Sequence, residues 1–212
     1  MTDRTKSLAD KMQRARPDRS AAKPSLDART PPGQHIVDTF PVLDLGVRPD
    51  IQREAWRLRL FGAVTQERVL DWDALMRLPQ APIVADFHCV TRWSRLDTAW
   101  DGVPAWRVAA LAAPLPEARF VTLHGYDDYT ANLPIEGLMA DDALLAYRLS
   151  GQPLPREHGG PVRMLAPQRY GWKSVKWLKS IEFLVEDRPG FWEARGYHND
   201  ADPWREERFR TA

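Results

Sequence analysis

Alternation of apolar and charged side chains marks the first strand that the sequence predicts. In the stretch WRLRL (56–60), positions 56, 58 and 60 are apolar and the two positions between them are arginines. A period of two places one face of a segment in the core and the other in solvent, which is typical of a half-buried strand. Gly62 follows and predicts a turn. The same alternation predicts a strand over 120–124.

Short apolar runs and helix-capping residues predict the remaining elements. Four further strands are expected, at 83–87, 144–149, 162–166 and 175–185. Asp71 is a capping-type residue and predicts a helix over 71–78 that ends before Pro82. Pro104, in the first turn, predicts a helix to 112, and a third helix is expected over 135–140. Short strands mixed with short helices indicate an α+β fold rich in β-structure, not a doubly wound sheet.

Residues 1–34 differ in composition from the rest of the chain. They contain eight Lys or Arg and four Asp, with prolines at positions 17, 24, 31 and 32. Charge disfavours a packed core and proline interrupts a helix, so we expect a flexible N-terminal arm over 1–34. The nine tryptophans are spread between positions 56 and 204. This spread predicts one continuous domain over 35–212.

Whole-chain composition narrows the class of protein. The 212 residues are 43% hydrophobic and 28% charged, with a net charge of +1, which gives no support to bulk nucleic-acid binding. A single cysteine excludes an intramolecular disulfide. The N-terminus lacks the apolar stretch of a secretory signal, and no apolar run reaches membrane-spanning length. We expect a cytoplasmic protein that does not contact a membrane.

Cys89, the only cysteine, stands in the stretch DFHCVTRWS (86–94). Three interpretations fit the residues alone. A lone cysteine is commonly a small buried hydrophobe, whereas a cation such as His88 or Arg92 would favour a reactive thiolate. A soft thiolate can also be one ligand of a metal whose other ligands come from a cofactor. The absence of CxxC excludes a dithiol redox site, and the histidines show no spacing typical of zinc.

A basic segment over 158–176 is the second candidate site. Glycines and the Ser174 hydroxyl are interleaved with five potentially cationic side chains, His158, Arg163, Arg169, Lys173 and Lys176. Glycine lets backbone N–H groups approach a ligand, and the cations match a phosphate. Lys173 and Lys176 would face opposite sides of a strand, whereas a loop over 171–174 would let them converge. A solvated basic turn between two strands is an equally good interpretation. No GxGxxG or P-loop motif occurs.

Several segments together resemble the molybdopterin-binding domain of the sulfite oxidase family. They are FHCVTRWS (87–94), YTANLP (129–134), LLAYRLSGQPLPREHGGPVRMLAPQRYGWKSVKWLKSIEF (144–183) and the ending GFWEARGYHNDADPW (190–204). The likeness spans residues 31–206 and is most specific in the third segment. It is to the small bacterial members, which lack haem and accessory domains. The resemblance implies a β-rich mixed fold of the sulfite oxidase type.

The resemblance also implies a mononuclear molybdenum–molybdopterin cofactor. Cys89 matches the cysteine whose thiolate ligates the metal, and Tyr129 matches the family's active-site tyrosine, whose phenol can pass a proton. The segment 40–43 sits where the family chain enters the cofactor site. Cofactor contacts are implied for seven further residues: Thr122, His158, Arg163, Gly171, Lys173, Ser174 and Lys176.

Departures from the family pattern concern the substrate. Where sulfite-oxidising members carry arginines, this chain has Val37, Trp93 and Ser94. An anion such as sulfite needs positioned cations, so sulfite itself is disfavoured. Arg92 is a candidate replacement, although it would leave the loop at a different angle. Trp93 and Ser94 resemble the branch that reduces S-oxides, which indicates a less charged substrate.

The resemblance therefore implies an oxidoreductase that catalyses two-electron oxygen-atom transfer on a small sulfur or nitrogen compound. Cys89, Tyr129 and Arg92 are the catalytic candidates. No haem segment is evident, so a separate electron-carrier protein is expected. Three alternatives stay open: an S- or N-oxide reductase of the same cofactor class, a protein that holds the cofactor without efficient turnover, and a non-enzymatic module that binds phosphate or nucleic acid.

Overall fold

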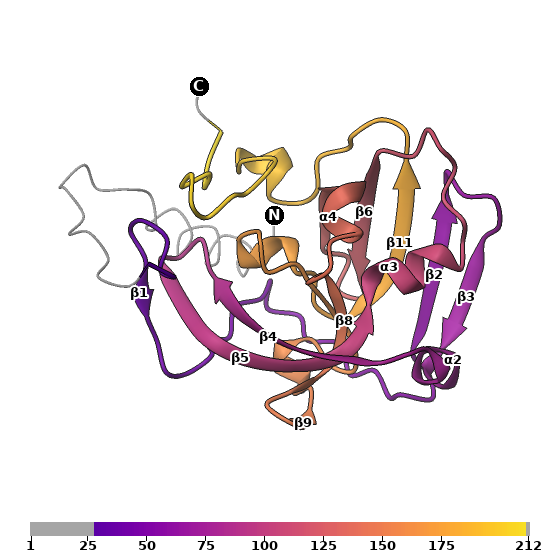
Figure 1. Cartoon of the computed structure of the whole chain (residues 1–212), viewed down its shortest axis with the longest axis horizontal. Helices are drawn as coiled ribbons and strands as arrows, with labels where there is room; N and C mark the ends of the chain where they lie inside the picture. Colours follow the sequence, from indigo (N-terminus) through magenta and orange to yellow (C-terminus); the bar gives the residue numbers. More distant parts are fainter. Residues whose placement is uncertain (1–27, 211–212) are drawn as a thin grey trace.

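Two mixed β-sheets form the framework of residues 28–210, the part that this computed structural model describes. Figure 1 shows the five-stranded sheet (sheet B) on the right and the six-stranded sheet (sheet A) curving below it. Strands dominate and the helices are short, so the predicted β-rich α+β class is confirmed. The arm predicted over 1–34 falls mainly on residues 1–27, which lie outside the described residues.

Sheet B contains the strand with the clearest alternation in the sequence. Its strands are β3 (Arg68–Asp71), β2 (Arg57–Gly62), β11 (Leu178–Leu184), β6 (Phe120–Gly125) and β7 (Thr130–Pro134), in that order. In β2 the two leucines are fully buried and the two arginines are exposed, as the period of two predicts. The β2–β11 pair is parallel and the other pairs are antiparallel.

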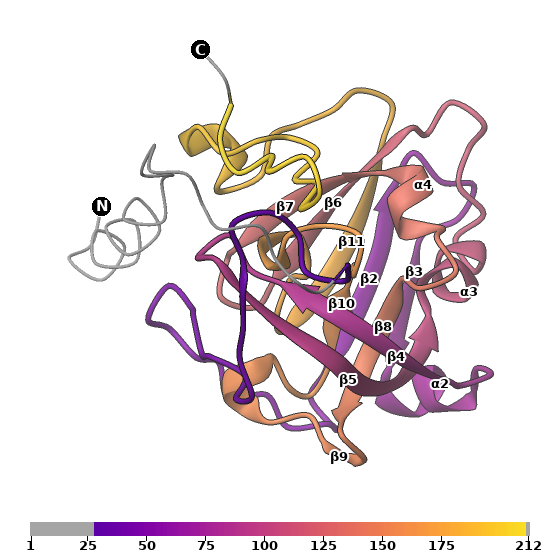
Figure 2. The same ribbon diagram turned by 60° about the vertical axis from the view of Figure 1, so that its left-hand side comes forward.

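Sheet A is organised around the 12-residue strand β5 (Trp93–Pro104). This strand pairs in parallel with β1 (His35–Ile36) and antiparallel with β4 (Ala81–His88) and β8 (Leu144–Leu149). Strand β8 in turn pairs with β9 (Gln152–Pro153) and β10 (Arg163–Leu165). Figure 2 shows β4 and β5 running side by side across the front of the molecule. The turn between them carries Cys89.

Three short α-helices occur where the sequence predicts helices. They are α2 (Trp72–Arg77), α3 (Ala105–Ala110) and α4 (Ile135–Leu138). The Asp71 side chain caps α2 by accepting a hydrogen bond from the backbone N–H of Ala74 at 2.7 Å. Three 3-10 turns follow at Arg156–His158, Gly171–Lys173 and Glu193–Arg195. Among the described residues no helix is long and apolar enough to cross a membrane.

The sequence did not predict strands β1, β3, β5, β7 and β9, and the strand predicted over 175–185 begins three residues later than expected. Strand β5 carries Arg95, Asp97 and Asp101, so its sequence lacks the apolar run of a buried strand. Pairing with neighbours on both edges stabilises it instead. The predicted strand 175–185 begins only at Leu178, because Trp177 has a positive φ of 50° that interrupts the extended chain.

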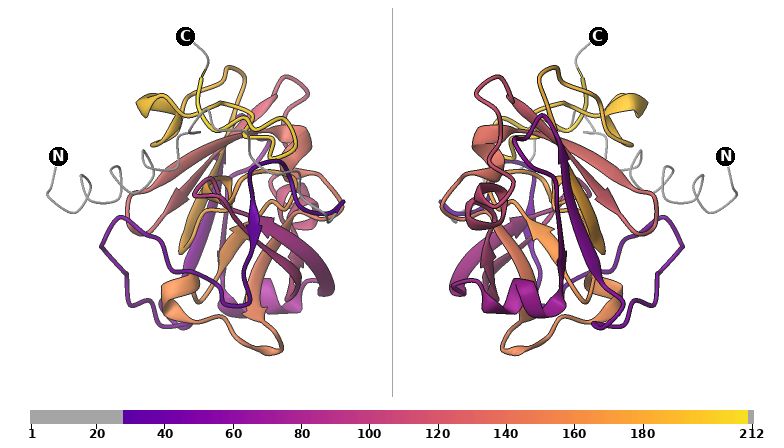
Figure 3. Two further views of the ribbon diagram at one scale, coloured as in Figure 1. Left: turned by 90° about the vertical axis from the view of Figure 1, so that its left-hand side faces the viewer. Right: turned by 90° about the vertical axis from the view of Figure 1, so that its right-hand side faces the viewer.

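The C-terminal segment 185–210 packs against three other regions of the chain. Figures 1 and 3 show this segment, in yellow, lying above the upper edge of the β-structure. Backbone hydrogen bonds join Phe191 to Thr130 at 2.9 Å and Tyr170 to Ala201 at 2.8 Å. A third contact, from Arg208 Nη1 to the Val90 carbonyl at 2.8 Å, joins the segment to the turn that follows β4.

Candidate active site

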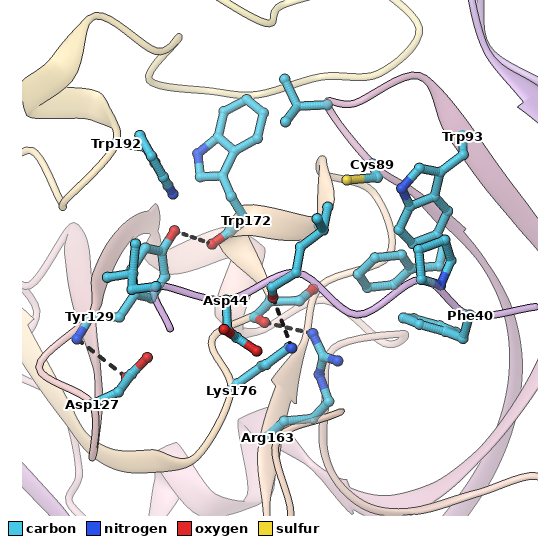
Figure 4. Close-up of a pocket in the computed structure, with 17 residues that line it drawn as sticks. Phe40, Asp44, Cys89, Trp93, Asp127, Tyr129, Arg163, Trp172, Lys176 and Trp192 are labelled. Atoms are coloured by element: carbon cyan, nitrogen blue, oxygen red, sulfur yellow. Dashed lines mark hydrogen bonds between the residues drawn. The ribbon is translucent and has the colours of Figure 1, made fainter. Parts of the chain in front are cut away.

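A cavity between the two sheets brings the two candidate sites of the sequence together. It encloses about 710 Å³, including the part open to solvent. Figure 4 shows Cys89, Trp93 and Phe40 on one side, Tyr129, Asp127 and Trp192 on the other, and Arg163 with Lys176 at the base. Most of the accessible lining is apolar. The cavity therefore combines a sulfur atom, an aromatic wall and a cationic base.

Cys89 lies in a tight turn held by contacts from distant parts of the chain. Within the turn, the Cys89 N–H donates to the Trp93 carbonyl at 2.9 Å and the Arg92 N–H donates to the Cys89 carbonyl at 3.0 Å. From outside, Gln34 Nε2 donates to the Cys89 carbonyl at 3.0 Å, and Arg208 Nη1 donates to the Val90 carbonyl at 2.8 Å. These hydrogen bonds to the backbone of the turn, together with packing, therefore fix the position of the Cys89 sulfur at the cavity wall.

Cys89 is buried, with 7% of the residue exposed, and its sulfur has a polar partner. Thr91 Oγ1 lies 3.1 Å from Cys89 Sγ. Burial raises the pKa of the Cys89 thiol, and hydrogen bonds from the side chain and backbone of Thr91 oppose that rise. The charges of Arg208 and Lys176 act in the same direction as Thr91. Cys89 is the only cysteine of the chain, and it faces the cavity.

Arg163 and Lys176 form the cationic base of the cavity. Arg163 is 2% exposed, and its Nη1 and Nη2 atoms donate to the carbonyls of His158 at 3.0 Å and Ser174 at 2.7 Å. Lys176 Nζ donates to the carbonyls of Leu43 at 2.9 Å and Glu157 at 2.6 Å. Burial lowers the pKa of Arg163 to about 9, and burial together with Arg163 lowers that of Lys176 to about 7. Both cations are destabilised here, so an anion in the cavity would stabilise them.

Gly171 and Ser174 line the cavity for different reasons. A Cβ at Gly171 would lie 2.4 Å from the Phe87 ring, so glycine is needed for this close approach. The Ser174 hydroxyl accepts a hydrogen bond from the Ala166 N–H at 3.0 Å and thereby joins the 171–174 turn to the end of β10. The two residues shape the wall between the Cys89 turn and the cationic base.

Tyr129 and Asp127 form the wall opposite Cys89. The Tyr129 phenol donates to the Trp172 carbonyl at 2.7 Å, and burial raises its pKa well above the usual value, so it stays protonated. Burial also raises the pKa of Asp127 to about 6, although its Oδ1 accepts a hydrogen bond from the Tyr129 N–H at 3.3 Å. Of these two groups, only Asp127 exchanges a proton near neutral pH.

Lys173 points away from Lys176, so the two lysines do not converge. Lys173 is fully buried and its Nζ lies 2.6 Å from Glu193 Oε1 and 2.7 Å from Asn132 Oδ1. The same Glu193 oxygen accepts a hydrogen bond from Trp172 Nε1 at 2.8 Å. The Lys173 ammonium therefore lies behind the cavity wall, in a polar cluster that holds the Trp172 indole. A cofactor contact by Lys173 stays a prediction, because its ammonium group bonds to Glu193 and Asn132 and does not line the cavity.

Three more predicted residues lie near the cavity without lining it. His158 is buried, and its ring centroid lies 5.0 Å from that of the lining residue Phe40. Thr122 lies on β6 opposite Asn132 of β7, beside the cluster that contains Lys173. Arg92 contributes backbone contacts that close the Cys89 turn, with a positive φ of 71°. Substrate binding by Arg92 and cofactor binding by Thr122 stay predictions.

Sequence reasoning missed several lining residues. Asp44, Asp127 and Trp192 line the cavity, but no motif identified them. Trp172 also lines it and lies within the basic segment 158–176, although no role was assigned to it. Asp127 stands two positions before Tyr129, and this acidic-aromatic spacing is the available signal. Asp44 and Trp192 reach the cavity through the path of the loops, which the sequence pattern does not define.

Comparisons with known proteins agree with this geometry. The family model described as "Oxidoreductase molybdopterin binding domain" matches residues 45–192. The uncharacterized oxidoreductase YuiH of Bacillus subtilis is 43% identical over 182 residues, which is 85% of this chain and 92% of YuiH. The crystal structure of the sulfane dehydrogenase SoxCD of Paracoccus pantotrophus superposes with a TM-score of 0.60 at 23% identity, covering 66% of this chain and 40% of that chain. The last likeness shows the fold.

Proposed function

The chain belongs to the family of oxidoreductases with a molybdopterin-binding domain, and we propose that it transfers an oxygen atom between water and a small sulfur or nitrogen compound of low charge. Family membership makes the protein an enzyme with a molybdenum–molybdopterin cofactor. Because the sequence offers no haem segment, we propose a separate carrier protein as the source or acceptor of electrons.

One observation carries the proposal: a single cavity joins the Cys89 sulfur to the cationic base of Arg163 and Lys176. A thiolate is a ligand for a soft metal, and buried cations match a phosphate. A group that contains both a metal and a phosphate fits these two ends of one cavity. Cys89 would ligate the metal, and Arg163 and Lys176 would hold the phosphate and pterin.

A buried polar group beside the cavity, the imidazole of His158, also fits a bound cofactor. His158 Nδ1 is buried and has no hydrogen-bond partner within residues 28–210. Burial, with the charge of Lys176 next, lowers the pKa of His158 to about 4, so the imidazole is neutral. A buried polar atom without a partner destabilises the protein by about 1–3 kcal/mol. A cofactor that bonds to His158 would remove this cost.

When bound, the cofactor supplies the exchange of two electrons and of the oxygen atom. The residues of the opposite wall supply orientation and proton handling. Tyr129 remains a neutral group whose oxygen is fixed by its bond to the Trp172 carbonyl. The Asp127 carboxyl, with a pKa of about 6, can accept a proton from a water molecule or return it near neutral pH. Trp172 and Trp192 add two aromatic residues to the lining of the cavity.

The lining of the cavity favours a substrate of low charge. Within residues 28–210 its cationic side chains are Arg163 and Lys176, both at the base that we assign to the cofactor. Trp93 occupies one position where sulfite-oxidising members carry arginine, and it lines the cavity. Ser94, at another, is fully buried, and its hydroxyl hydrogen-bonds His88 Nδ1 at 2.8 Å. Sulfite would therefore meet aromatic rings where it needs cations.

The same lining favours an S- or N-oxide reductase as the second candidate, because such oxides are neutral and carry methyl groups that pack on aromatic rings. The nucleic-acid alternative has little support. Arg163 and Lys173 are buried, and Lys176 is bonded to backbone carbonyls. Arg169 is half-buried, so the basic segment offers little exposed cationic surface.

The first experiment measures molybdenum by mass spectrometry and pterin by fluorescence in wild-type protein and in Cys89→Ser, expressed in a host that makes the cofactor. We expect near-stoichiometric molybdenum and pterin in the wild type, and loss of metal with retained fold in the variant. Full molybdenum content in Cys89→Ser would refute the ligand assignment. Absence of molybdenum from folded wild-type protein would refute the proposed function.

A second experiment identifies the direction of the reaction and the charge of the substrate. Dithionite-reduced protein is offered dimethyl sulfoxide, trimethylamine N-oxide and nitrate, and ferricyanide-oxidised protein is offered sulfite and dimethyl sulfide. We expect the neutral compounds to react faster than the anions of the same size. Preferential reaction with sulfite would contradict the argument from the aromatic lining.

A further inference from the structure

Thr91 makes two polar contacts with the sulfur that faces the cavity. Its hydroxyl oxygen lies 3.1 Å from Cys89 Sγ. Its backbone N–H forms a second hydrogen bond to the same sulfur, and both favour the charged thiolate over the neutral thiol. The turn over 89–92 brings them within reach, because the Arg92 N–H donates to the Cys89 carbonyl and closes it.

The direction of the hydroxyl contact follows from the chemistry of a metal ligand. A cysteine that binds a metal does so as a thiolate and has no proton to donate. The hydroxyl of threonine has one proton and can turn it toward the sulfur. Once Cys89 is a ligand, Thr91 can therefore act only as the donor in this contact.

A hydrogen bond to a metal-bound sulfur withdraws electron density from the metal. The sulfur then donates less charge, so the reduced state of the metal, which carries more electron density, is stabilised relative to the oxidised state. Hydrogen bonds to ligating sulfurs are an established means by which proteins set reduction potentials. Removing one such bond shifts the potential downward.

We propose that Thr91 sets the reduction potential of the molybdenum centre by donating its hydroxyl proton to the Cys89 thiolate. The inference rests on the proposed function, because it requires Cys89 to ligate the metal. Neither a motif nor the family resemblance suggested a role for Thr91. Thr91 acts through Cys89 and is thus a positioning residue, not a catalytic one.

The turn holds Thr91 in place before any metal binds. Gln34 and Arg208 bond to the carbonyls of Cys89 and Val90, the two residues that precede Thr91. Arg208 is only 2% exposed, and its guanidinium also lies 4.9 Å from the centre of the Tyr170 ring. The backbone on which the Thr91 hydroxyl is mounted is therefore pre-organised, so the bond costs little entropy.

The test compares Thr91→Val with Thr91→Ser in holoenzyme purified from a cofactor-producing host. Valine has nearly the shape of threonine without the hydroxyl, and serine retains the hydroxyl. Molybdenum content is measured first, and the potential is then obtained by redox titration followed by electron paramagnetic resonance. Thr98→Val is the control for the loss of a threonine hydroxyl, because Thr98 is a buried threonine on β5 that does not line the cavity.

We expect Thr91→Val to keep its molybdenum and to lower the equilibrium constant for reduction about tenfold, a fall of about 30 mV for a two-electron couple. Thr91→Ser and Thr98→Val should match the wild type. An unchanged potential in molybdenum-replete Thr91→Val would overturn the proposal. So would loss of molybdenum in Thr91→Val alone, since the hydroxyl would then serve ligation and not tuning. A wild-type protein without molybdenum would instead overturn the proposed function on which the inference rests.

Discussion

The buried ion pair between Lys173 and Glu193 leads to the most quantitative prediction. Their side chains are 0% and 2% exposed, and Nζ lies 2.6 Å from Oε1. The substitution Lys173→Met keeps the length of the side chain but leaves the Glu193 carboxylate buried without its cation. Removing one partner of a buried pair destabilises a protein by about 3–5 kcal/mol. Total stability is about 5–15 kcal/mol, so the effect is a large fraction of it.

Urea unfolding of cofactor-free protein, followed by tryptophan fluorescence, measures this effect. With a slope of about 2–3 kcal/mol/M, the midpoint should fall by at least about 1 M. The double variant Lys173→Met/Glu193→Gln removes both charges and keeps an acceptor for the Trp172 indole, so it should recover part of the loss. The control is Arg205→Met, because Arg205 is 73% exposed and its ion pairs measure 3.8 Å. It should cost at most about 1 kcal/mol.

Two results would refute the reasoning. One is a loss below about 1 kcal/mol in Lys173→Met, which would mean that the carboxylate is solvated or protonated without cost. The other is strict additivity of the two single substitutions in the double variant, which would mean that the two groups do not interact. Either result would also remove the argument that this cluster holds the Trp172 indole at the cavity wall.

Three further predictions follow from other contacts. Gly171→Ala should destabilise the protein by about 1–3 kcal/mol, because the added Cβ would lie 2.4 Å from the Phe87 ring. The control is Gly137→Ala, whose Cβ would have its nearest contact at 3.8 Å, and it should not destabilise the protein in the same unfolding assay. Asp71→Ala should cost about 0.5–2 kcal/mol through loss of the α2 cap, and Asp71→Asn should restore most of it. The pKa of Lys176 is lowered to about 7, so we expect anion binding to depend on pH. Sulfate, a dianion throughout, should bind cofactor-free protein best below about pH 7. Its affinity should fall as the pH rises toward about 9, because the Lys176 ammonium loses its proton. Calorimetric titration would test this, and Lys176→Met should remove the part of the fall centred near pH 7, whereas any change near pH 6 or pH 9, from Asp127 and Arg163, should remain.

The sequence predicted the elements whose pattern is local. The alternation in β2 and the cap at Asp71 depend on neighbouring residues, and both occur in the structure. Strand β5 could not be predicted, because its charged positions are tolerated only in a strand paired on both edges. Long-range pairing of this kind leaves no periodic signal in one sequence.

The candidate site likewise contains residues that local sequence segments predicted and residues whose positions depend on long-range contacts. Cys89, Arg163, Ser174, Lys176, Gly171 and Tyr129 were predicted from segments that resemble the family, and they line one cavity. The direction of Lys173 could not be predicted, because it depends on Glu193, twenty positions later in the chain. Asp44 and Trp192 were missed because they reach the cavity through irregular loops.

The two outside contacts on the Cys89 turn have a consequence for biosynthesis. Gln34 and Arg208 lie 55 and 118 positions from their acceptors in the chain, one on each side. Arg208 follows Val90 in the chain, so a nascent chain does not complete the turn until the segment around Arg208 has left the ribosome. The metal that we propose for Cys89 would therefore meet its ligand in the final geometry only after the segment around Arg208 is in place, and a chain truncated before Arg208 would present an incompletely held ligand.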